Sequence, residues 1–403
     1  MIYQLINGCS FDCSFNRCLI PIYVDSESGK IIDEFYAKSY AGSDLINSID
    51  VSDCFVVPGF IDTHIHGAYN FDCSDASIES ISKIASSLPT FGVSAFCPTT
   101  MTMSREDIES TFKSTDEAIT KSKPTDATIL GIHLEGPFLN SKMCGVQDAS
   151  FCMNPMEGAK FIDNLLIKYP GLLLEVDLAP ELETSLEFIS RYKNDFVISL
   201  AHSLCNYEQA SKAFICGARR ITHAFNAMSG IEKRAPGIVG AAFDQDFVFC
   251  ELICDGYHVD KTIIRMLFKA FGSKRIVVVS DSMRGSGMPD GEYMLYTSLV
   301  TTRNGRTYYG KDERLAGSVT NLAKECENLI SYGIPVEQVI ESLTITPLRS
   351  LKLSYEQTGL GLVTPGARAS INVINSKGEL LLVFANGILL HDYRQEREVG
   401  NER

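Results

Sequence analysis

The stretch FIDTHIH at residues 60–66 is the first of eight short apolar runs on which the fold depends. From this point runs of strand length alternate with longer stretches of helical pattern, which is typical of βα units and a parallel sheet. Eight strands over about 300 residues predict a (β/α)8 barrel better than an open doubly wound sheet. The other seven runs are SAFCPTT (94–100), TILGIHLEG (128–136), LLLEVDLAP (172–180), DFVISLAHS (195–203), RRITHAFNAM (219–228), FVFCELICDG (247–256) and RIVVVSDSM (275–283).

Six stretches between these runs have a helical pattern, and several open with Ser, Asp or Asn at a cap position. They are residues 76–91, 104–121, 156–168, 183–193, 206–216 and 260–271. Residues 1–57 and 360–403 instead contain strand-like runs broken by turn residues, with weak helical periodicity at the N-terminal end. We therefore predict an α/β chain with a catalytic barrel at 58–359 and a small β-sandwich domain formed by both chain ends.

The overall composition excludes several classes of function. The chain has 403 residues, of which 45% are hydrophobic and 21% charged, which is typical of a globular protein. A net charge of −14 argues against binding to nucleic acid or to an anionic membrane surface. The N-terminal residues show no signal-peptide pattern and no run approaches 18 apolar residues, which predicts a cytoplasmic location.

Cysteine is frequent, with 13 residues, but the number is odd and no CxxC pair occurs. The spacing of Cys9, Cys13 and Cys18 fits no standard metal site. The sequence therefore predicts neither a disulfide framework nor a cysteine-bound metal.

Histidine is scarce, with seven residues, yet several stand where predicted strands end. In an α/β barrel the C-terminal strand ends face a common mouth, so residues that are distant in sequence meet there. Six polar residues occupy such positions: His64, His66, Glu135, His202, His223 and Asp281. Since imidazole and carboxylate are ligands that divalent Zn, Fe, Mn or Co prefer, they predict a site for one or two metal ions.

The residues within this set suggest separate roles. His64 and His66 are two positions apart, so a strand places both on one face, where they can chelate one ion. Asp281 ends the most apolar run and could act as a general base on a metal-activated water. His133 lies one layer deeper than Glu135, where a hydrogen-bonded structural imidazole is the better interpretation.

Two cationic side chains near the predicted mouth suggest an anion site. Arg234 lies in the loop after the sixth run, and His258 follows the seventh. A guanidinium group is well shaped for phosphate, so the two residues could clamp one. A solvated surface charge is the alternative reading of Arg234.

Several short segments have a sequence typical of one enzyme family. They are PGFIDTHIHG (58–67), HLEGPFLN (133–140), AHS (201–203), THAFNAMS (222–229), RAPGIVGAA (234–242), CDGYHVD (254–260), VSDSM (279–283), GMPDGEY (287–293) and LAGS (315–318). Together these segments resemble the N-acetylglucosamine-6-phosphate deacetylases of the amidohydrolase superfamily over about residues 56–350. The resemblance implies a metal-dependent barrel enzyme that hydrolyses the acetamide of an amino-sugar 6-phosphate, releasing acetate and the free amine.

The resemblance also implies roles for individual residues. Glu135, His202 and His223 match the principal metal ligands, His64 and His66 match the pair that holds a second ion in some members, and Glu135 would bridge the two. Asp281 matches the catalytic aspartate, and Arg234 and His258 match the phosphate-binding pair. Substrate contacts are implied for Asn226, Ala227, Leu315, Ala316 and Gly317. A homodimer is implied because family members share phosphate contacts across a dimer interface.

The chain departs from the family pattern in two places. After HLEGP the family usually has a histidine that polarises the acetyl carbonyl, but this chain has Val146 and Gln147 in the substrate-facing loop. Gln147 can donate a neutral hydrogen bond but carries no charge, so more of the polarisation falls to the metal. Arg284 stands where the family usually has small residues, either as a solvated charge or as an extra cation near the substrate.

Three alternatives remain open at this point. N-acetylgalactosamine 6-phosphate differs from the glucosamine compound in the direction of one hydroxyl group, and no residue in the sequence reads that position. A cyclic-amide hydrolase typically has a carboxylated lysine on the fourth strand, whereas LLLEVDLAP contains no lysine. A non-catalytic sugar-phosphate-binding barrel would be expected to lack a metal ligand or Asp281.

Overall fold

The structure is a computed structural model that describes residues 1–41 and 46–394. Eight parallel strands follow one another in chain order, and each of them overlaps one of the eight apolar runs. They are β8 (Phe60–Ile65), β11 (Val93–Pro98), β13 (Ile132–Phe138), β14 (Leu173–Leu178), β15 (Val197–Leu200), β16 (Arg220–Ile221), β17 (Phe249–Leu252) and β18 (Ile276–Val278). The short strand β12 (Thr128–Ile129) pairs with β11.

These strands form two sheets that touch at both edges. One sheet has the order β12-β11-β8 and the other runs from β13 to β18. A parallel bridge between Thr99 and His133 joins the end of β11 to β13. At the other edge, the amide of Asp281 donates to the carbonyl of His64 at 2.9 Å, so the ends of β18 and β8 lie together. Residues that follow these strands therefore gather at one end of the molecule.

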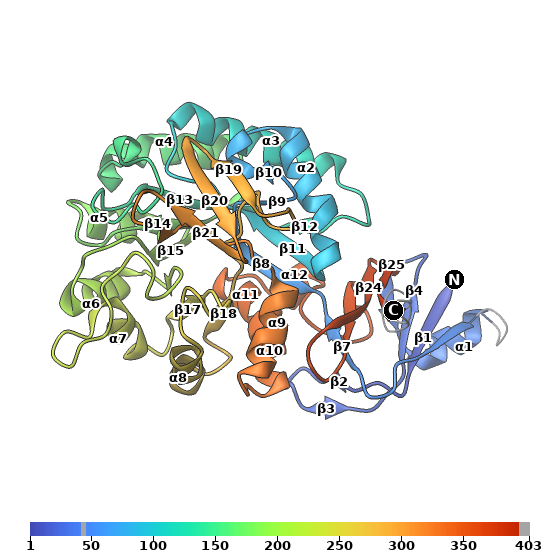
Figure 1. Cartoon of the computed structure of the whole chain (residues 1–403). Coiled ribbons are helices and arrows are strands. Elements are labelled where there is room, and N and C mark those ends of the chain that lie inside the picture. The colour runs from blue at the N-terminus through green and yellow to red at the C-terminus, as the bar shows by residue number, and fades with distance from the viewer. Residues whose placement is uncertain (42–45, 395–403) are drawn as a thin grey trace.

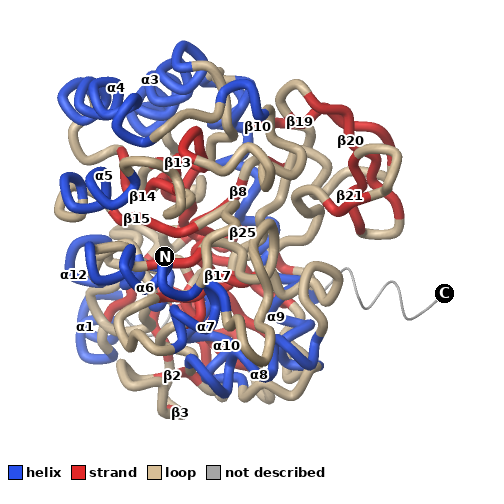
Figure 2. The backbone as a smooth tube through the Cα atoms, turned by 90° about the vertical axis from the view of Figure 1, so that its left-hand side faces the viewer, coloured by secondary structure: helices blue, strands red, loops and turns tan. Residues whose placement is uncertain are grey.

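Helices cover the outside of the strands (Figures 1 and 2). Each of the six predicted helical stretches overlaps a helix, and Ser77, Ser104, Asn206 and Asp260 cap four of these helices by accepting a backbone N–H. The six are α2 (Ile78–Ser87), α3 (Arg105–Lys121), α4 (Pro155–Lys168), α5 (Ser185–Tyr192), α6 (Tyr207–Cys216) and α8 (Lys261–Phe271). The helices not anticipated are α7 (Gly237–Phe243), α9 (Leu322–Ser331), α10 (Val336–Leu343), α11 (Ile345–Ser350) and α12 (Tyr355–Thr358).

The two chain ends lie on the same side of the molecule (Figure 1). They form two four-stranded sheets with a shared core in which Leu5, Ile22 and Val24 pack with Leu382 and Phe384. The first sheet contains β1 (Ile2–Ile6), β4 (Ile22–Asp25), β5 (Lys30–Ile32) and β6 (Ile46–Asp50). The second contains β7 (Phe55–Pro58), β23 (Ile371–Ile374), β24 (Leu380–Ala385) and β25 (Ile388–Asp392). Helix α1 (Glu34–Ala41) interrupts the N-terminal strands, where weak helical periodicity gave no indication of it.

A separate antiparallel sheet lies between β18 and α9 and projects from the body of the molecule (Figure 2). Its central turn uses Asn304 and Gly305, both with positive φ, which is the two-residue hairpin chemistry that Asn-Gly favours. It consists of β19 (Gly291–Leu295), β20 (Ser298–Arg303), β21 (Arg306–Tyr309) and β22 (Arg314–Leu315). We call these four strands the flap sheet.

The remaining elements are short. Two small sheets pair β2 (Ser10–Phe11) with β3 (Arg17–Cys18) and β9 (Gly67–Ala68) with β10 (Phe71–Asp72). The 3-10 helices within the described residues are η2 (Cys73–Asp75), η3 (Leu88–Phe91) and η4 (Ala149–Phe151).

Candidate metal and active site

The six predicted strand-end residues meet at one end of the parallel strands. His64 lies in β8 and Glu135 in β13, while His66, His202, His223 and Asp281 follow their strands. His202, His223 and Asp281 have positive φ values of 43°, 31° and 47°. Such conformations are uncommon for residues with a side chain and occur often at functional sites, where the surrounding fold maintains them. Here these sharp turns aim three side chains at a common centre.

Glu135 lies at this centre, within reach of all four histidines. Its Oε1 atom is 3.0 Å from Nε2 of His202, 3.2 Å from Nε2 of His223 and 3.8 Å from Nε2 of His64. Its Oε2 atom is 3.3 Å from Nε2 of His66. The carboxylate therefore lies between two groups of imidazoles, as a bridging ligand would.

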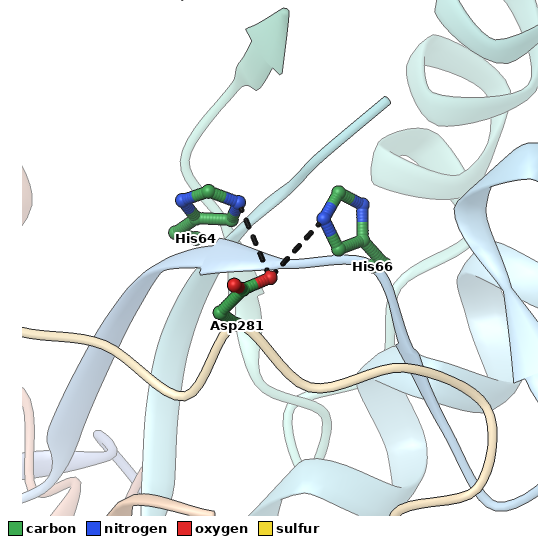
Figure 3. A group of neighbouring side chains, drawn as sticks. All are labelled: His64, His66 and Asp281. Atoms are coloured by element: carbon green, nitrogen blue, oxygen red, sulfur yellow. Dashed lines mark ion pairs between the residues drawn. The ribbon is translucent and has the colours of Figure 1, made fainter. Parts of the chain in front are cut away.

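Asp281 faces the other side of the first histidine pair. Figure 3 shows its carboxylate between the two rings, with Oδ1 at 3.5 Å from Nε2 of His64 and 3.3 Å from Nε2 of His66. Two of the four groups of possible metal ligands among the described residues lie here, each with its ligand atoms within 4.8 Å of one another: His64, His66 and Asp281, and Glu135, His202 and His223.

Hydrogen bonds on the far side of the rings fix their orientation. Nδ1 of His66 donates to the carbonyl of Thr99 at 3.2 Å, and Nδ1 of His202 donates to the carbonyl of Met143 at 2.8 Å. Nδ1 of His64 donates to Glu251 at 2.7 Å. Such bonds select the tautomer that presents Nε2 to the centre, as in proteins where histidine binds a metal.

The donor set fits a divalent ion. Nε2 of His64 is buried and, among the residues that the structure describes, has no hydrogen-bond partner. Leaving a buried polar atom unsatisfied costs stability, and an ion coordinated there would remove the cost. The surrounding atoms are imidazole nitrogens and carboxylate oxygens, which suit Zn, Fe, Mn or Co.

The charges of the site favour a bound cation. Burial alone would raise the pKa of Glu135, but hydrogen bonds from His202, His223 and His66 hold it well below its usual value. Burial alone would lower the pKa of His66, but Asp281 and Glu135 raise it to about 10. Protons on the histidines therefore balance the two carboxylates when no metal is bound.

A buried ionic network lies beneath this site. Arg220 is fully buried, with Nη1 at 2.8 Å from Glu175 and Nη2 paired with Glu251, the carboxylate that also holds His64. Beside it, His133 donates from Nδ1 to the carbonyl of Thr63 at 3.1 Å. This buried, hydrogen-bonded ring fits the structural interpretation of His133, which stays a prediction because His133 also belongs to two groups that could hold a metal ion. The network could not be predicted from the sequence because its partners come from separate strands.

A pocket of about 270 Å³ opens over the six residues. His66, Glu135, His202, His223 and Asp281 line it, whereas His64 lies buried beneath. The predicted substrate-contacting residues in its lining are Val146, Gln147, Asn226, Ala227, His258, Leu315, Ala316 and Gly317. Lys142, Tyr309 and Arg314 also line the pocket and were not predicted; a lysine beside the HLEGPFLN segment and an arginine beside LAGS were the available signals.

Gln147 is held in one orientation. Its Oε1 atom accepts a hydrogen bond from the amide of Thr102 at 2.7 Å. Because the oxygen is engaged, the Nε2 group is left to donate, and none of the described residues accepts from it. Gln147 is thus arranged as a hydrogen-bond donor beside the pocket.

Arg234 and Arg284 lie away from these residues. Arg234 is exposed and lines a different pocket with Leu204 and Glu232, so this chain does not bring it to His258. Arg284 is paired with Asp75, with Nη2 at 2.6 Å from the carboxylate, which makes it neither a solvated charge nor a free cation beside the substrate.

The cysteines lie outside the candidate metal groups. All 13 are free thiols, and among the described residues none belongs to such a group, although Cys144 lines the pocket. Over the same residues, no helix combines the length and the apolar character needed to cross a membrane.

Comparison with known proteins gives the class to which this fold and site belong. The model of the amidohydrolase family matches residues 55–390, and the chain belongs to this family. A curated relative, the N-acetylglucosamine-6-phosphate deacetylase of Bacillus subtilis, is 33% identical over 348 residues, covering 83% of this chain and 84% of the relative.

Two further proteins extend the comparison. The N-acetylgalactosamine-6-phosphate deacetylase of an Escherichia coli strain is 31% identical and covers 82% of this chain and 86% of its own. The crystal structure of N-acetylglucosamine-6-phosphate deacetylase from Pasteurella multocida superposes with a TM-score of 0.86 at 24% identity, over 97% of this chain and 100% of the other. The α/β amidohydrolase fold is therefore shared.

Proposed function

We propose that the chain is a metal-dependent deacetylase that hydrolyses the acetamide of N-acetylglucosamine 6-phosphate to glucosamine 6-phosphate and acetate. The observation that carries this proposal is the convergence of four histidines, Glu135 and Asp281 at the base of one pocket. The names of the relatives supply the substrate class.

The proposal includes a more detailed architecture. The eight parallel strands would form a closed (β/α)8 barrel over residues 58–359, with residues 1–57 and 360–403 as a β-sandwich domain. The hydrogen bond between Asp281 and His64 supports closure, and the core that both chain ends share supports the second domain.

Five residues would hold the divalent metal: His64, His66, Glu135, His202 and His223. Glu135 would bridge if two ions bind, because its two oxygens face different histidines. A bound divalent ion supplies Lewis-acid chemistry, polarising the acetyl carbonyl and acidifying a water molecule.

The chain's own residues would carry the protons. Burial would raise the pKa of Asp281, but His64 and His66 hold it below its usual value, so the group is a carboxylate at neutral pH. Asp281 would accept a proton from the attacking water and then donate it to the sugar nitrogen as the C–N bond breaks. Gln147 would donate from Nε2 to the oxygen that gains negative charge.

The remaining pocket residues would bind the sugar. Asn226, Ala227, Val146, Leu315, Ala316 and Gly317 would surround it, and His258 would contact the phosphate. Arg234 could contribute to a phosphate site only from a neighbouring subunit, given its place on the surface. The cytoplasmic homodimer and the absence of a nucleic-acid partner stay predictions.

N-acetylgalactosamine 6-phosphate is a second candidate substrate because one of the relatives is named for it. The test is to measure acetate release from both phosphorylated sugars and from N-acetylglucosamine, and ring opening of dihydroorotate. The proposal expects the highest kcat/KM with N-acetylglucosamine 6-phosphate. A higher value with the galactosamine epimer would reassign the substrate, and hydrolysis of dihydroorotate alone would overturn the proposal.

A further inference from the structure

The pocket has carboxylates at its bottom and cationic side chains at its rim. Its carboxylates, Glu135 and Asp281, lie with the histidines at the base. Lys142 and Arg314 also line the pocket, and both are exposed. Among the described residues neither side chain has an ion pair or hydrogen bond. Their charges are therefore available to a ligand.

Three elements bring cationic or donor groups to this pocket. Lys142 lies in the loop after β13, where its backbone amide donates to the side chain of Asn140 at 3.0 Å. Arg314 lies in β22 of the flap sheet, directly opposite Tyr309 of β21. His258 belongs to the loop after β17.

The flap sheet joins the other two elements. The Arg306 guanidinium lies 4.0 Å from the centroid of the Tyr257 ring, which places β21 against the loop of His258. On the other side, Ser298 at the start of β20 donates to the carbonyl of Val146 at 3.0 Å, which ties the flap sheet to the loop of Lys142. Lys142, His258 and Arg314 are thus on neighbouring segments around one opening.

His258 is oriented to donate into this opening. Asp255 accepts from Nδ1 of His258 at 2.7 Å and from the backbone amide of His258 at 2.9 Å. With Nδ1 bonded to the Asp255 carboxylate, Nε2 donates to a ligand only when the ring is protonated, because both nitrogens carry a hydrogen only in the imidazolium form. An anion at the rim would then accept a hydrogen bond from this imidazolium and charge-assisted bonds from the two other cations.

The negative net charge of the chain makes cations at the pocket important for binding an anion. A protein with a net charge of −14 repels an anionic substrate at long range, so local cations must supply the attraction. A pocket of about 270 Å³ is small for a ligand site and suits a single sugar unit, whose acetamide and phosphate lie at opposite ends. With the acetamide beside the carboxylates at the bottom of the pocket, the phosphate would reach the rim.

We propose that Arg314 and Lys142, together with His258, bind the phosphate group of the substrate and set the preference for phosphorylated sugars. This inference rests on the proposed deacetylase function, and it assigns the phosphate charge to the same chain that holds the metal ligands. Arg234 is not needed for it.

The test uses the metal-loaded full chain and the variants Arg314→Met, Lys142→Met and their combination. Lys311→Met is the matched control, because Lys311 is exposed three residues before Arg314 and does not line the pocket. Arg234→Met tests the alternative source of charge. Thermal unfolding verifies that each variant is folded, as expected for exposed positions.

Two quantities are measured for each variant. The first is the affinity for inorganic phosphate by titration calorimetry, which needs no catalysis. The second is the ratio of kcat/KM for N-acetylglucosamine 6-phosphate to that for N-acetylglucosamine. We expect each single variant to lower both by about tenfold, since a charge-assisted hydrogen bond is lost, and Lys311→Met to match the wild type.

The outcomes separate the inference from the proposed function. Unchanged phosphate affinity and unchanged ratio in the double variant would overturn the inference, as would a loss confined to Arg234→Met. If no sugar is deacetylated by the wild type, the proposed function fails, while a drop in phosphate affinity in the variants would still support the assignment of the anion site.

Discussion

Asp281 is the residue whose environment fits a proton carrier. It lies at the end of β18 with Oδ1 between the rings of His64 and His66. Replacing Asp281 by Asn keeps the size of the side chain but removes the proton acceptor. We expect Asp281→Asn to retain metal and to lose acetate release by about 10²- to 10⁴-fold. Metal analysis of the purified variant, together with an acetate assay, checks both parts, and a variant with wild-type activity would remove Asp281 from this role.

Gln147 is expected to donate a hydrogen bond to the acetyl carbonyl oxygen, whereas Asp281 transfers the proton of the attacking water. Gln147→Ala removes the Nε2 donor, which the bond from Thr102 to Oε1 holds in place. We expect kcat to fall by about 100-fold with a small change in KM, because the donor acts in the transition state. Gln147→His, which installs the residue that the family usually carries, should restore activity. Steady-state kinetics of both variants decide this, and an unchanged kcat in the alanine variant would contradict it.

The histidines link metal binding to pH. The raised pKa of His66, about 10, means that protons stabilise the metal-free fold fully below the unfolded value near 6.5, and this contribution is lost as the pH rises towards 10. Metal competes with these protons, so its affinity rises with pH. The increase in Tm on adding metal should therefore grow from about pH 6 to about pH 9. Calorimetry in buffers of different ionisation enthalpy should also show proton release, and a Tm increment that falls with pH would be the contrary result.

Among single residues, the six at the strand ends could be predicted from the sequence because strand order alone brings them together in a barrel. The hydrogen-bond partners of the histidine rings could not be predicted. Glu251 lies 187 positions after His64, and only the folded chain places it 2.7 Å from the ring. Arg234 lines another pocket of this chain, so its predicted contact with phosphate would have to come from a neighbouring subunit and stays a prediction.

Three strands of the six-stranded parallel sheet share the buried ionic network below the site. Arg220 of β16 lies between Glu175 of β14 and Glu251 of β17. Arg220→Leu would leave two buried carboxylates without their cation, and we expect a loss of about 3–5 kcal/mol in the free energy of unfolding. The adjacent Arg219, which is partly exposed, is the matched control: Arg219→Leu should cost about 1 kcal/mol or less.

Urea unfolding of Arg220→Leu and Arg219→Leu measures the free energy of unfolding of each variant. Equal and small losses in both would show that the network contributes little to the stability of the parallel strands.

Among the elements, the eight strands and six of the helices could be predicted from their hydrophobic periods and caps. The flap sheet could not be placed, although its Asn304-Gly305 turn is a hairpin signal, because its strands are half exposed and carry no long apolar run. Helix α1 was missed for the same reason.

On the scale of the whole molecule, both chain ends depend on one shared core. The Phe384 ring of β24 lies 5.4 Å from that of Tyr3 in β1, so the two ends meet directly. We expect Phe384→Ala to lower the free energy of unfolding by about 3–5 kcal/mol through the cavity that it leaves. Ile388→Ala, at a partly exposed position in β25, should change it by about 0.5 kcal/mol or less. Chemical denaturation measures both, and similar effects of the two variants would argue against a shared core.

Length and composition predicted a globular chain but not where its charged groups lie. A net charge of −14 describes the molecule as a whole, whereas Lys142 and Arg314 gather at one pocket only after folding. The scarce histidines carried more information than the frequent cysteines because their positions coincided with strand ends.

The most direct test of the account is acetate release from N-acetylglucosamine 6-phosphate by the purified chain before chelation, after chelation and after divalent metal is restored. The account predicts one acetate for each glucosamine 6-phosphate formed, loss of turnover on chelation and recovery with metal. Turnover that survives complete removal of the metal, or no acetate from the metal-loaded chain, would contradict it.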